Sequence, residues 1–228
     1  MGTKLDFVIL GLDCESAQQL WNAALSELGR LDGMLDRFKP SSEVSRINAS
    51  PNPLEFPRSR EMETVLTLCS EYRSATGGLF DVRAGGEYDF GGFAKGYFLK
   101  KCLEMLRGAS VRDAFINFGN STILGLGRNP AGESWSVDLI DPYSGLALDR
   151  IILEDGTLST SGNTPGYSGH TINPHTGKGV EDRRLVTAVS ADPLQAEVLS
   201  TALMAGGPGS LPMLSVAFPS ASLRIHSL

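Results

Sequence analysis

Apolar and polar positions alternate near the start of the chain and then change to helical spacing. Residues 4–12 carry leucine, phenylalanine and isoleucine at every second position, which predicts a strand. Residues 14–38 repeat leucine and alanine at intervals of three and four, which predicts a long amphipathic helix. Residues 39–53 are dense in serine, proline and asparagine, so we expect an ordered loop there.

Three further stretches have helical periodicity and recognisable ends. Residues 60–78 end in a glycine pair, and residues 93–109 follow a glycine-rich turn. Residues 192–207 begin with Asp192 at a capping position and Pro193 in the first turn, and they end at another glycine pair. Each of these patterns predicts a helix.

Short apolar runs at hairpin spacing dominate the second half of the chain. Turn sequences rich in glycine, proline and aspartate separate them, as in an antiparallel sheet. The 228 residues suit one compact domain, and no repeat or low-complexity linker divides them. The predicted strands are 113–119, 121–127, 135–141, 147–153, 157–162 and 183–191, followed by a final hairpin over 214–228.

Charge and cysteine usage narrow the classes of partner and compartment. The net charge is −6 and the basic residues are scattered, so we expect no nucleic-acid partner. Cys14, Cys69 and Cys102 belong to no metal-binding cluster, which predicts buried, inert thiols in a reducing compartment. No membrane span or signal peptide is visible. We therefore expect a cytoplasmic location for the chain as given, or a periplasmic or membrane-anchored one if a leader was removed.

The stretch DFGGFAKGY, residues 89–97, is the first candidate for chemistry. Two glycines before a helix let the backbone approach a ligand, and an anion suits the free N–H groups there. Lys95 adds a positive charge for a phosphate, and Asp89 offers an acceptor to a sugar or base. Taken alone, a glycine pair before a helix is more often an ordinary turn, and the order of a P-loop is absent.

The stretch AEVLSTAL, residues 196–203, is the second candidate. Glu197 and Thr201 lie four positions apart on one predicted helix face, so a carboxylate and a hydroxyl point toward the same place. Oxygen ligands of this kind suit Mg²⁺. By spacing alone a polar helix face is the more common explanation, because such pairs are abundant on helices.

The third candidate is the loop-like stretch at residues 159–177, which is rich in glycine, proline and hydroxyl side chains. Ordered loops on rigid scaffolds often carry catalytic groups. His170 is a candidate general base near neutral pH, and a histidine that caps a turn is an equally good local explanation. We interpret His175 as a solvent-facing turn residue.

Taken together, these stretches resemble the ApbE-type FAD:protein FMN transferases. The resemblance covers nearly the whole chain and implies an α+β, T-fold-like single domain with a mainly antiparallel sheet flanked by helices. The resemblance rests on the order in which the matching stretches occur, because each stretch alone is weak evidence. They are MGT (1–3), FKPSSEVSRIN (38–48), TGGLFD (76–81), DFGGFAKGY (89–97), INFGN (116–120), STSGN (159–163), HTINPHTG (170–177) and AEVLSTAL (196–203).

The resemblance implies a reaction and a role for each matching residue. The reaction is the Mg²⁺-dependent transfer of FMN from FAD to a Thr or Ser hydroxyl of an acceptor protein, with release of AMP. The acceptor site has the form Asp-x-x-Ser/Thr-Gly-Ala-Ser/Thr. The implied roles are FAD contacts for Asp89, Lys95 and Thr171, flavin contacts for Met1 and Phe38, metal ligands in Glu197, Thr201 and the Gly92 carbonyl, and a catalytic base in His170.

The chain departs from the family pattern at four places. Glu197 stands where the family usually has aspartate, and Phe38 stands where tyrosine is common. The segment between residues 81 and 89 is shortened, and the loop after residues 160–162 is short as well. An FAD pyrophosphatase that releases FMN and AMP, and an inactive flavin-binding protein, are therefore alternative functions. The sequence names neither the acceptor protein nor the oligomeric state.

Overall fold

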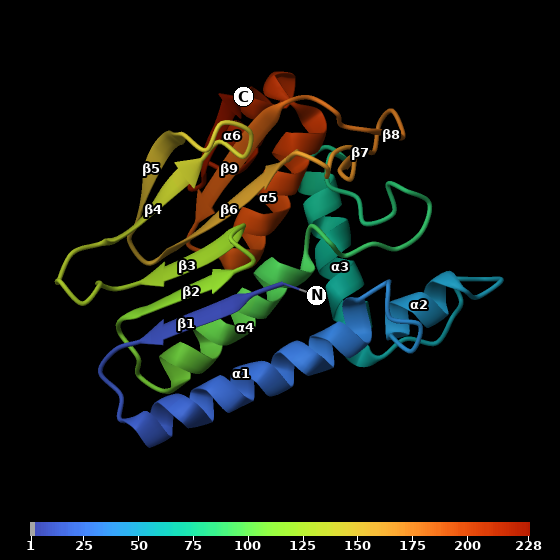
Figure 1. The fold of residues 1–228 in the computed structure, drawn as a ribbon. Helices are drawn as coiled ribbons and strands as arrows, with labels where there is room; N and C mark the ends of the chain where they lie inside the picture. The colour runs from blue at the N-terminus through green and yellow to red at the C-terminus, as the bar shows by residue number, and fades with distance from the viewer. Residues whose placement is uncertain (1–2) are drawn as a thin grey trace.

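A six-stranded antiparallel sheet forms the centre of the molecule (Figure 1). The computed structural model describes residues 3–228, so Met1, a predicted flavin contact, lies outside the described residues. The strand order is β1-β2-β3-β6-β9-β10. These strands are β1 (Leu5–Ile9), β2 (Ala114–Phe118), β3 (Thr122–Leu126), β6 (Gly156–Gly162), β9 (Arg184–Ser190) and β10 (Ser222–Ser227).

Two short ribbons of strands complete the β structure. The first, β4 (Trp135–Ile140) with β5 (Ala147–Leu153), leaves the central sheet between β3 and β6. Trp135 anchors it, because its indole N–H donates to the Leu126 carbonyl oxygen at 2.9 Å. The second, β7 (Ile172–Asn173) with β8 (Lys178–Gly179), lies in the loop-like stretch of the third candidate.

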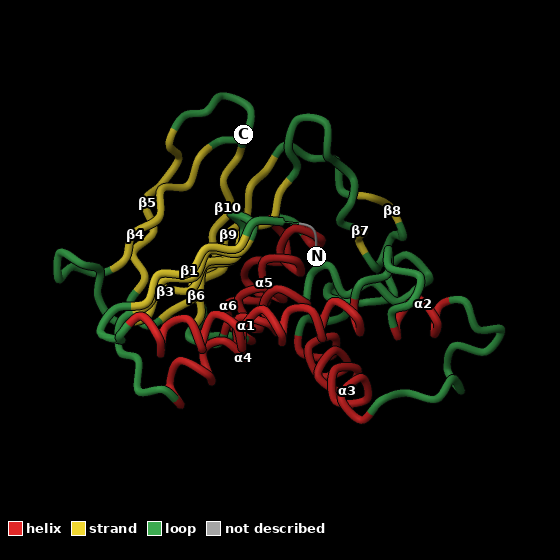
Figure 2. The backbone as a smooth tube through the Cα atoms, turned by 60° about the horizontal axis from the view of Figure 1, so that its bottom comes forward, coloured by secondary structure: helices red, strands yellow, loops and turns green. Residues whose placement is uncertain are grey.

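The helices gather on one side of the sheet (Figure 2). Because the strands carry buried side chains toward this layer, the main hydrophobic core lies between sheet and helices. No helix of residues 3–228 is long and apolar enough to cross a membrane. The helices are α1 (Cys14–Leu35), α2 (Glu43–Asn48), α3 (Arg60–Ala75), α4 (Ala94–Gly108), α5 (Pro193–Gly206) and α6 (Leu211–Ala217), with a 3₁₀ turn η1 (Pro208–Ser210).

Helix α5 is the most deeply buried of these helices, which fits a sequence that is apolar almost all round. Its start is the one predicted, because the Asp192 side chain accepts a hydrogen bond from the Leu194 N–H at 2.9 Å and Pro193 follows the cap. The helix packs on β6 and β9 and crosses α4. Its polar residues therefore lie in the interior of the molecule.

Glycines allow α4 and α5 to approach each other closely. A Cβ atom added to Gly96 would lie 2.5 Å from the Glu197 Cβ and 2.7 Å from the Pro193 carbonyl oxygen. One added to Gly92, in the turn before α4, would lie 2.5 Å from the Thr201 Oγ1. Real Cβ atoms do not approach other atoms so closely, so both glycines are required by this crossing.

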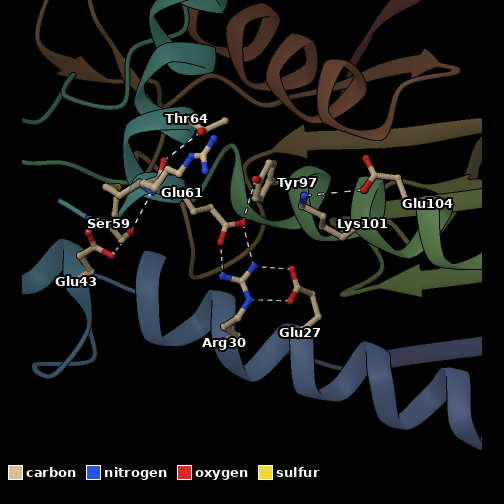
Figure 3. A network of polar contacts seen from close by, with 11 residues as sticks. Glu27, Arg30, Glu43, Ser59, Glu61, Thr64, Tyr97, Lys101 and Glu104 are labelled. Carbon is tan, nitrogen blue, oxygen red and sulfur yellow. Dashed lines mark hydrogen bonds and ion pairs between the residues drawn. The ribbon is translucent and has the colours of Figure 1, made fainter.

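A cluster of charged and polar side chains joins α1, α3 and α4 (Figure 3). Arg30 of α1 donates to both carboxylate oxygens of Glu27 and contacts Glu61 of α3 through two nitrogens. The Tyr97 hydroxyl of α4 donates to Glu61 at 3.1 Å. The Arg30 guanidinium holds the pKa of Glu61 below its ordinary value. These contacts fix how α1 and α3 sit against α4.

Most predicted elements are present, and two are wrong. The expected loop at 39–53 contains α2, whose cap is Ser42 and whose buried face is Val44 and Ile47. The expected hairpin over 214–228 is a single strand, β10, preceded by α6, because the segment before Phe218 folds as a helix.

The cysteines fit the prediction at two positions of three. Cys69 and Cys102 are buried, and burial raises the pKa of both thiols, which makes them poor nucleophiles. Cys14 is exposed in the first turn of α1, so its predicted burial is wrong. The position faces solvent because the buried stripe of α1 begins further along the helix, at Ala24.

Candidate active site

Glu197 of α5 is the centre of a buried polar cluster. Its side chain is only 3% exposed, and one carboxylate oxygen accepts from the Thr122 hydroxyl at 2.6 Å and the Ser159 hydroxyl at 2.9 Å. The other carboxylate oxygen accepts from the Lys95 ammonium of α4. A buried carboxylate needs such partners, because an isolated charge away from water is very costly. The cluster therefore joins α4, α5 and two central strands.

Thr201 lies one turn after Glu197 on α5, and Gly92 lies against Thr201. The Thr201 hydroxyl, one turn after Glu197, donates to the Glu197 carbonyl oxygen at 3.1 Å, and the Gly92 backbone packs directly against the Thr201 side chain. The structure thus brings together the three residues predicted as metal ligands. No group of three or more His, Cys, Asp or Glu side chains within residues 3–228 is arranged to hold a metal ion.

The donor set nevertheless fits a hard cation in two respects. A carboxylate, a hydroxyl and a main-chain carbonyl are all-oxygen ligands, which Mg²⁺ prefers. The Glu197 carboxylate also already binds one cation, the Lys95 ammonium. The chemistry of the residues therefore suits a metal, while the carboxylate is neutralised by a lysine in this structure.

Serine hydroxyls extend the cluster toward the surface. Ser159 contacts Ser200 of α5 at 2.9 Å, and Ser200 contacts Ser161 at 2.9 Å. Ser159 and Ser200 are buried, whereas Ser161 is partly exposed at the end of β6. Ser159 and Ser161 of the stretch STSGN therefore both face α5, as alternate residues of one strand do.

Asp89 and Phe38 lie near each other and are linked through Arg37. The Arg37 guanidinium contacts Asp89 at 3.2 Å and lies over the Phe38 ring at 4.7 Å from its centroid. The Phe38 side chain is 80% exposed, and the other Asp89 oxygen accepts from the Gly91 N–H at 2.8 Å. An exposed aromatic face and an exposed carboxylate are thus held just before α4 begins.

His170 lies in the loop between β6 and β7, where the Tyr167 ring stacks on it. The ring centroids are 4.2 Å apart and the planes differ by 19°. Partial removal of water, and then the Lys95 charge, lower the pKa of His170 below its ordinary value. The lowered pKa favours the neutral imidazole near pH 7, which is the form that accepts a proton.

Main-chain and side-chain contacts hold the loop around His170 in place. The Thr171 carbonyl oxygen accepts from the Val180 N–H at 2.8 Å, and the Asn163 amide of STSGN donates to the Val180 carbonyl at 2.8 Å. The exposed His175, expected as a turn residue, contacts the Gly77 carbonyl oxygen at 3.0 Å after α3. It therefore ties the loop to another part of the chain and does not face the cluster around Glu197.

Two surface hollows lie away from these residues. One of about 310 Å³ is lined by Arg73 and His175, and one of about 680 Å³ by Lys178 and Arg184. None of the predicted site residues within 3–228 lines either hollow. The candidate site is accordingly defined by the polar cluster between α4 and α5.

A comparison with models of known protein families shows which family the chain belongs to. The family model described as the ApbE family matches residues 1–88 and 83–217. The chain belongs to the ApbE family. The predicted relationship is thus confirmed.

A curated ApbE relative matches part of the chain. It is named FAD:protein FMN transferase, comes from Rhodobacter capsulatus, and is 28% identical over 138 residues. The match covers 57% of this chain and 26% of the relative, so the chain corresponds to about a quarter of that protein's length.

Solved ApbE structures confirm the expected fold class. The flavin transferase ApbE from Vibrio cholerae has a TM-score of 0.82 at 20% identity, covering 99% of this chain and 89% of that one. The apo flavinyl transferase ApbE from Pseudomonas stutzeri has a TM-score of 0.80 at 22% identity, covering 98% and 87%. The ApbE protein from Thermotoga maritima has a TM-score of 0.80 at 20% identity, covering 99% and 94%. At these identities the likeness establishes the fold alone.

The structure adds residues that the sequence patterns did not identify. Thr122 and Ser159 bind Glu197, and nothing local marks them, because they come from strands that meet α5 only in the folded chain. Arg37 directly precedes Phe38 in the sequence, so its neighbourhood to a predicted site residue was a weak indication of its position. Tyr167 precedes His170 by three residues in the same loop, which was a similar indication.

Proposed function

We propose that this chain is an FAD:protein FMN transferase. The observation that carries the proposal is that Lys95, Thr201 and Gly92 meet the buried Glu197 at the α4–α5 crossing. These positions come from stretches far apart in the sequence, and each had been assigned to phosphate or metal binding. Membership of the ApbE family and the name of the curated relative support the same activity.

The proposed reaction is a phosphoryl transfer. The oxygen of an acceptor Thr or Ser hydroxyl forms a bond to the FMN phosphorus of FAD, and the bond between that phosphorus and the bridging oxygen breaks. AMP leaves with the bridging oxygen. The proton of the acceptor hydroxyl passes to a ring nitrogen of His170, whose lowered pKa keeps the imidazole neutral and able to accept it. Positioning and charge neutralisation dominate catalysis of this kind.

Glu197, Thr201 and the Gly92 carbonyl are the residues that would hold Mg²⁺. When bound, the ion supplies neutralisation of charge on the pyrophosphate oxygens. Lys95 supplies a second positive charge to the phosphates from the first turn of α4. Thr122 and Ser159 hold the Glu197 carboxylate in a fixed orientation from the sheet.

Phe38, Asp89, Thr171 and Met1 are the remaining proposed contacts with FAD. The exposed Phe38 ring offers an apolar face to the flavin, and Asp89 accepts hydrogen bonds from donors of FAD. Thr171 follows the proposed base in the same loop and is the further FAD contact. Met1 belongs to this set on the family pattern, outside the described residues.

Release of AMP from FAD tests the proposal. We expect release that depends on Mg²⁺, and we expect Glu197→Ala and Thr201→Val to reduce it by at least about 10²-fold because they remove metal ligands. Lys100→Met is the matched control, since Lys100 also joins α4 to α5, through Asp192 at 2.6 Å, outside the Glu197 cluster. Full activity in the Glu197 and Thr201 variants would overturn the assignment.

Oxygen-18 water separates transfer from hydrolysis. An FAD pyrophosphatase uses water as the nucleophile, so it would place one labelled oxygen on the phosphate of free FMN or of AMP. A transferase joins the FMN phosphorus to the acceptor oxygen, and neither product carries the label. Labelled free FMN as the main product in the presence of acceptor would replace the proposed function with the hydrolase.

A further inference from the structure

The ion pair between Lys95 and Glu197 gives Lys95 a second role. We propose that Lys95 competes with the metal ion for the Glu197 carboxylate, and that the pyrophosphate of FAD relieves this competition by drawing Lys95 away. The inference rests on the proposed function for the identity of the phosphate ligand. It makes metal binding and FAD binding depend on each other through one side chain.

The hydrogen bonds of Glu197 show which contact has to change. One carboxylate oxygen already accepts from Thr122 and Ser159, and the other accepts from Lys95. A divalent ion beside the Lys95 ammonium would place two cations at one carboxylate that is 3% exposed. Like charges at such a buried position repel strongly, because little water screens them. The carboxylate therefore holds the ammonium or the metal, not both.

Lys95 is the partner that is free to move. Thr122 and Ser159 are buried residues of β3 and β6, so their hydroxyls are fixed by the sheet. The Lys95 side chain is 23% exposed and has a four-carbon stem with several rotatable bonds. Its ammonium has no other ion-pair partner within residues 3–228. Breaking this one contact frees it for an anion in front of α4.

The neighbourhood of Lys95 favours an anion as its second partner. Lys95 lies in the first turn of α4, and no side chain caps that end of the helix. Burial, and after it the Lys95 charge, lower the pKa of His170, so the ammonium acts on this ring electrostatically. An anionic phosphate between Lys95 and His170 would thus meet one positive charge and one proton acceptor. The Lys95 ammonium, once released from Glu197, can therefore bind the phosphate in the same site.

Binding of Mn²⁺ to the free protein, measured by electron paramagnetic resonance without FAD, tests the competition. We expect Lys95→Met to bind Mn²⁺ about tenfold more tightly than the unaltered chain, a typical size for such coupling. Lys95→Arg keeps the cation and is expected to bind Mn²⁺ within about twofold of the unaltered chain. Lys100→Met, which removes the other α4–α5 ion pair, should leave Mn²⁺ affinity unchanged. Equal or weaker binding by Lys95→Met would overturn the inference.

A measurement on the unaltered chain covers the case in which Lys95→Met does not fold. With ¹³C-labelled lysine, the Lys95 side-chain resonance, assigned from Lys95→Arg, should shift when Mg²⁺ is added, and the Lys100 resonance should not. A Lys95 resonance unaffected by saturating Mg²⁺, or no metal binding at all, would refute the competition. Neither readout needs turnover, so failure of AMP release with a positive result here would count against the proposed function alone.

Discussion

Replacing Gly96 with alanine tests the α4–α5 crossing on which the site depends. The new Cβ would lie 2.5 Å from the Glu197 Cβ, 2.7 Å from the Pro193 carbonyl oxygen and 3.0 Å from the Leu194 Cα. Two of these atoms are backbone, so a rotamer change cannot relieve the contact and the helices must separate. Overpacking of this kind costs up to about 3 kcal/mol, while alanine returns roughly 1 kcal/mol of helix propensity. We expect a net loss of about 2 kcal/mol in the free energy of unfolding.

Urea denaturation followed by circular dichroism measures this loss. Gly29→Ala is the matched control, because Gly29 lies inside α1 and its added Cβ meets nothing within 4 Å. The control should gain up to about 1 kcal/mol from propensity alone. AMP release should also fall in Gly96→Ala, since separation of the helices moves Gly92, before α4, away from Thr201 of α5, and both are proposed metal ligands. A Gly96→Ala protein as stable as the Gly29→Ala protein would refute the close crossing.

Three further substitutions test separate parts of the site and its support. His170→Ala should lower transfer by about 10²-fold or more. In the unaltered chain the acid limb of transfer should have its midpoint below pH 6.5, because protonation disables a base whose pKa is lowered; a midpoint at or above pH 7 would contradict this. Phe38→Ala should weaken FAD binding in a fluorescence titration while changing the free energy of unfolding by no more than about 0.5 kcal/mol, because the ring is exposed; unchanged FAD affinity would remove Phe38 from the site. Tyr97→Phe should cost about 1 kcal/mol of stability in thermal unfolding through the lost bond to Glu61 and leave AMP release intact; a neutral effect would mean that the contact carries no stability.

Local patterns predicted most of the fold because each element carries its own signal. The strand at 4–12 alternates, and α5 has its capping Asp192, Pro193 and closing glycines. The prediction was wrong where an element was too short to show a periodic pattern. Helix α2 has six residues, so its two buried apolar positions are too few to show a period against the many serines and prolines around it.

The candidate site was predictable only in part. The spacing of Glu197 and Thr201 placed both on one helix face, and the glycines at 91 and 92 marked a turn before Lys95. That Lys95 would pair with Glu197 depends on how α4 crosses α5, which no local pattern encodes. Thr122 and Ser159 reach the same carboxylate because of strand order in the sheet. Contacts of this kind come from tertiary packing and appear only in the structure.

The intact mass of an acceptor protein tests the central claim most directly. The chain is incubated with FAD, Mg²⁺ and an acceptor carrying the site Asp-x-x-Ser/Thr-Gly-Ala-Ser/Thr, and AMP is assayed in the same samples. The account predicts a mass gain equal to one FMN phosphoester on the Thr or Ser, with one AMP per modified acceptor and no gain with Glu197→Ala. An acceptor of unchanged mass, whether AMP appears or not, would contradict it.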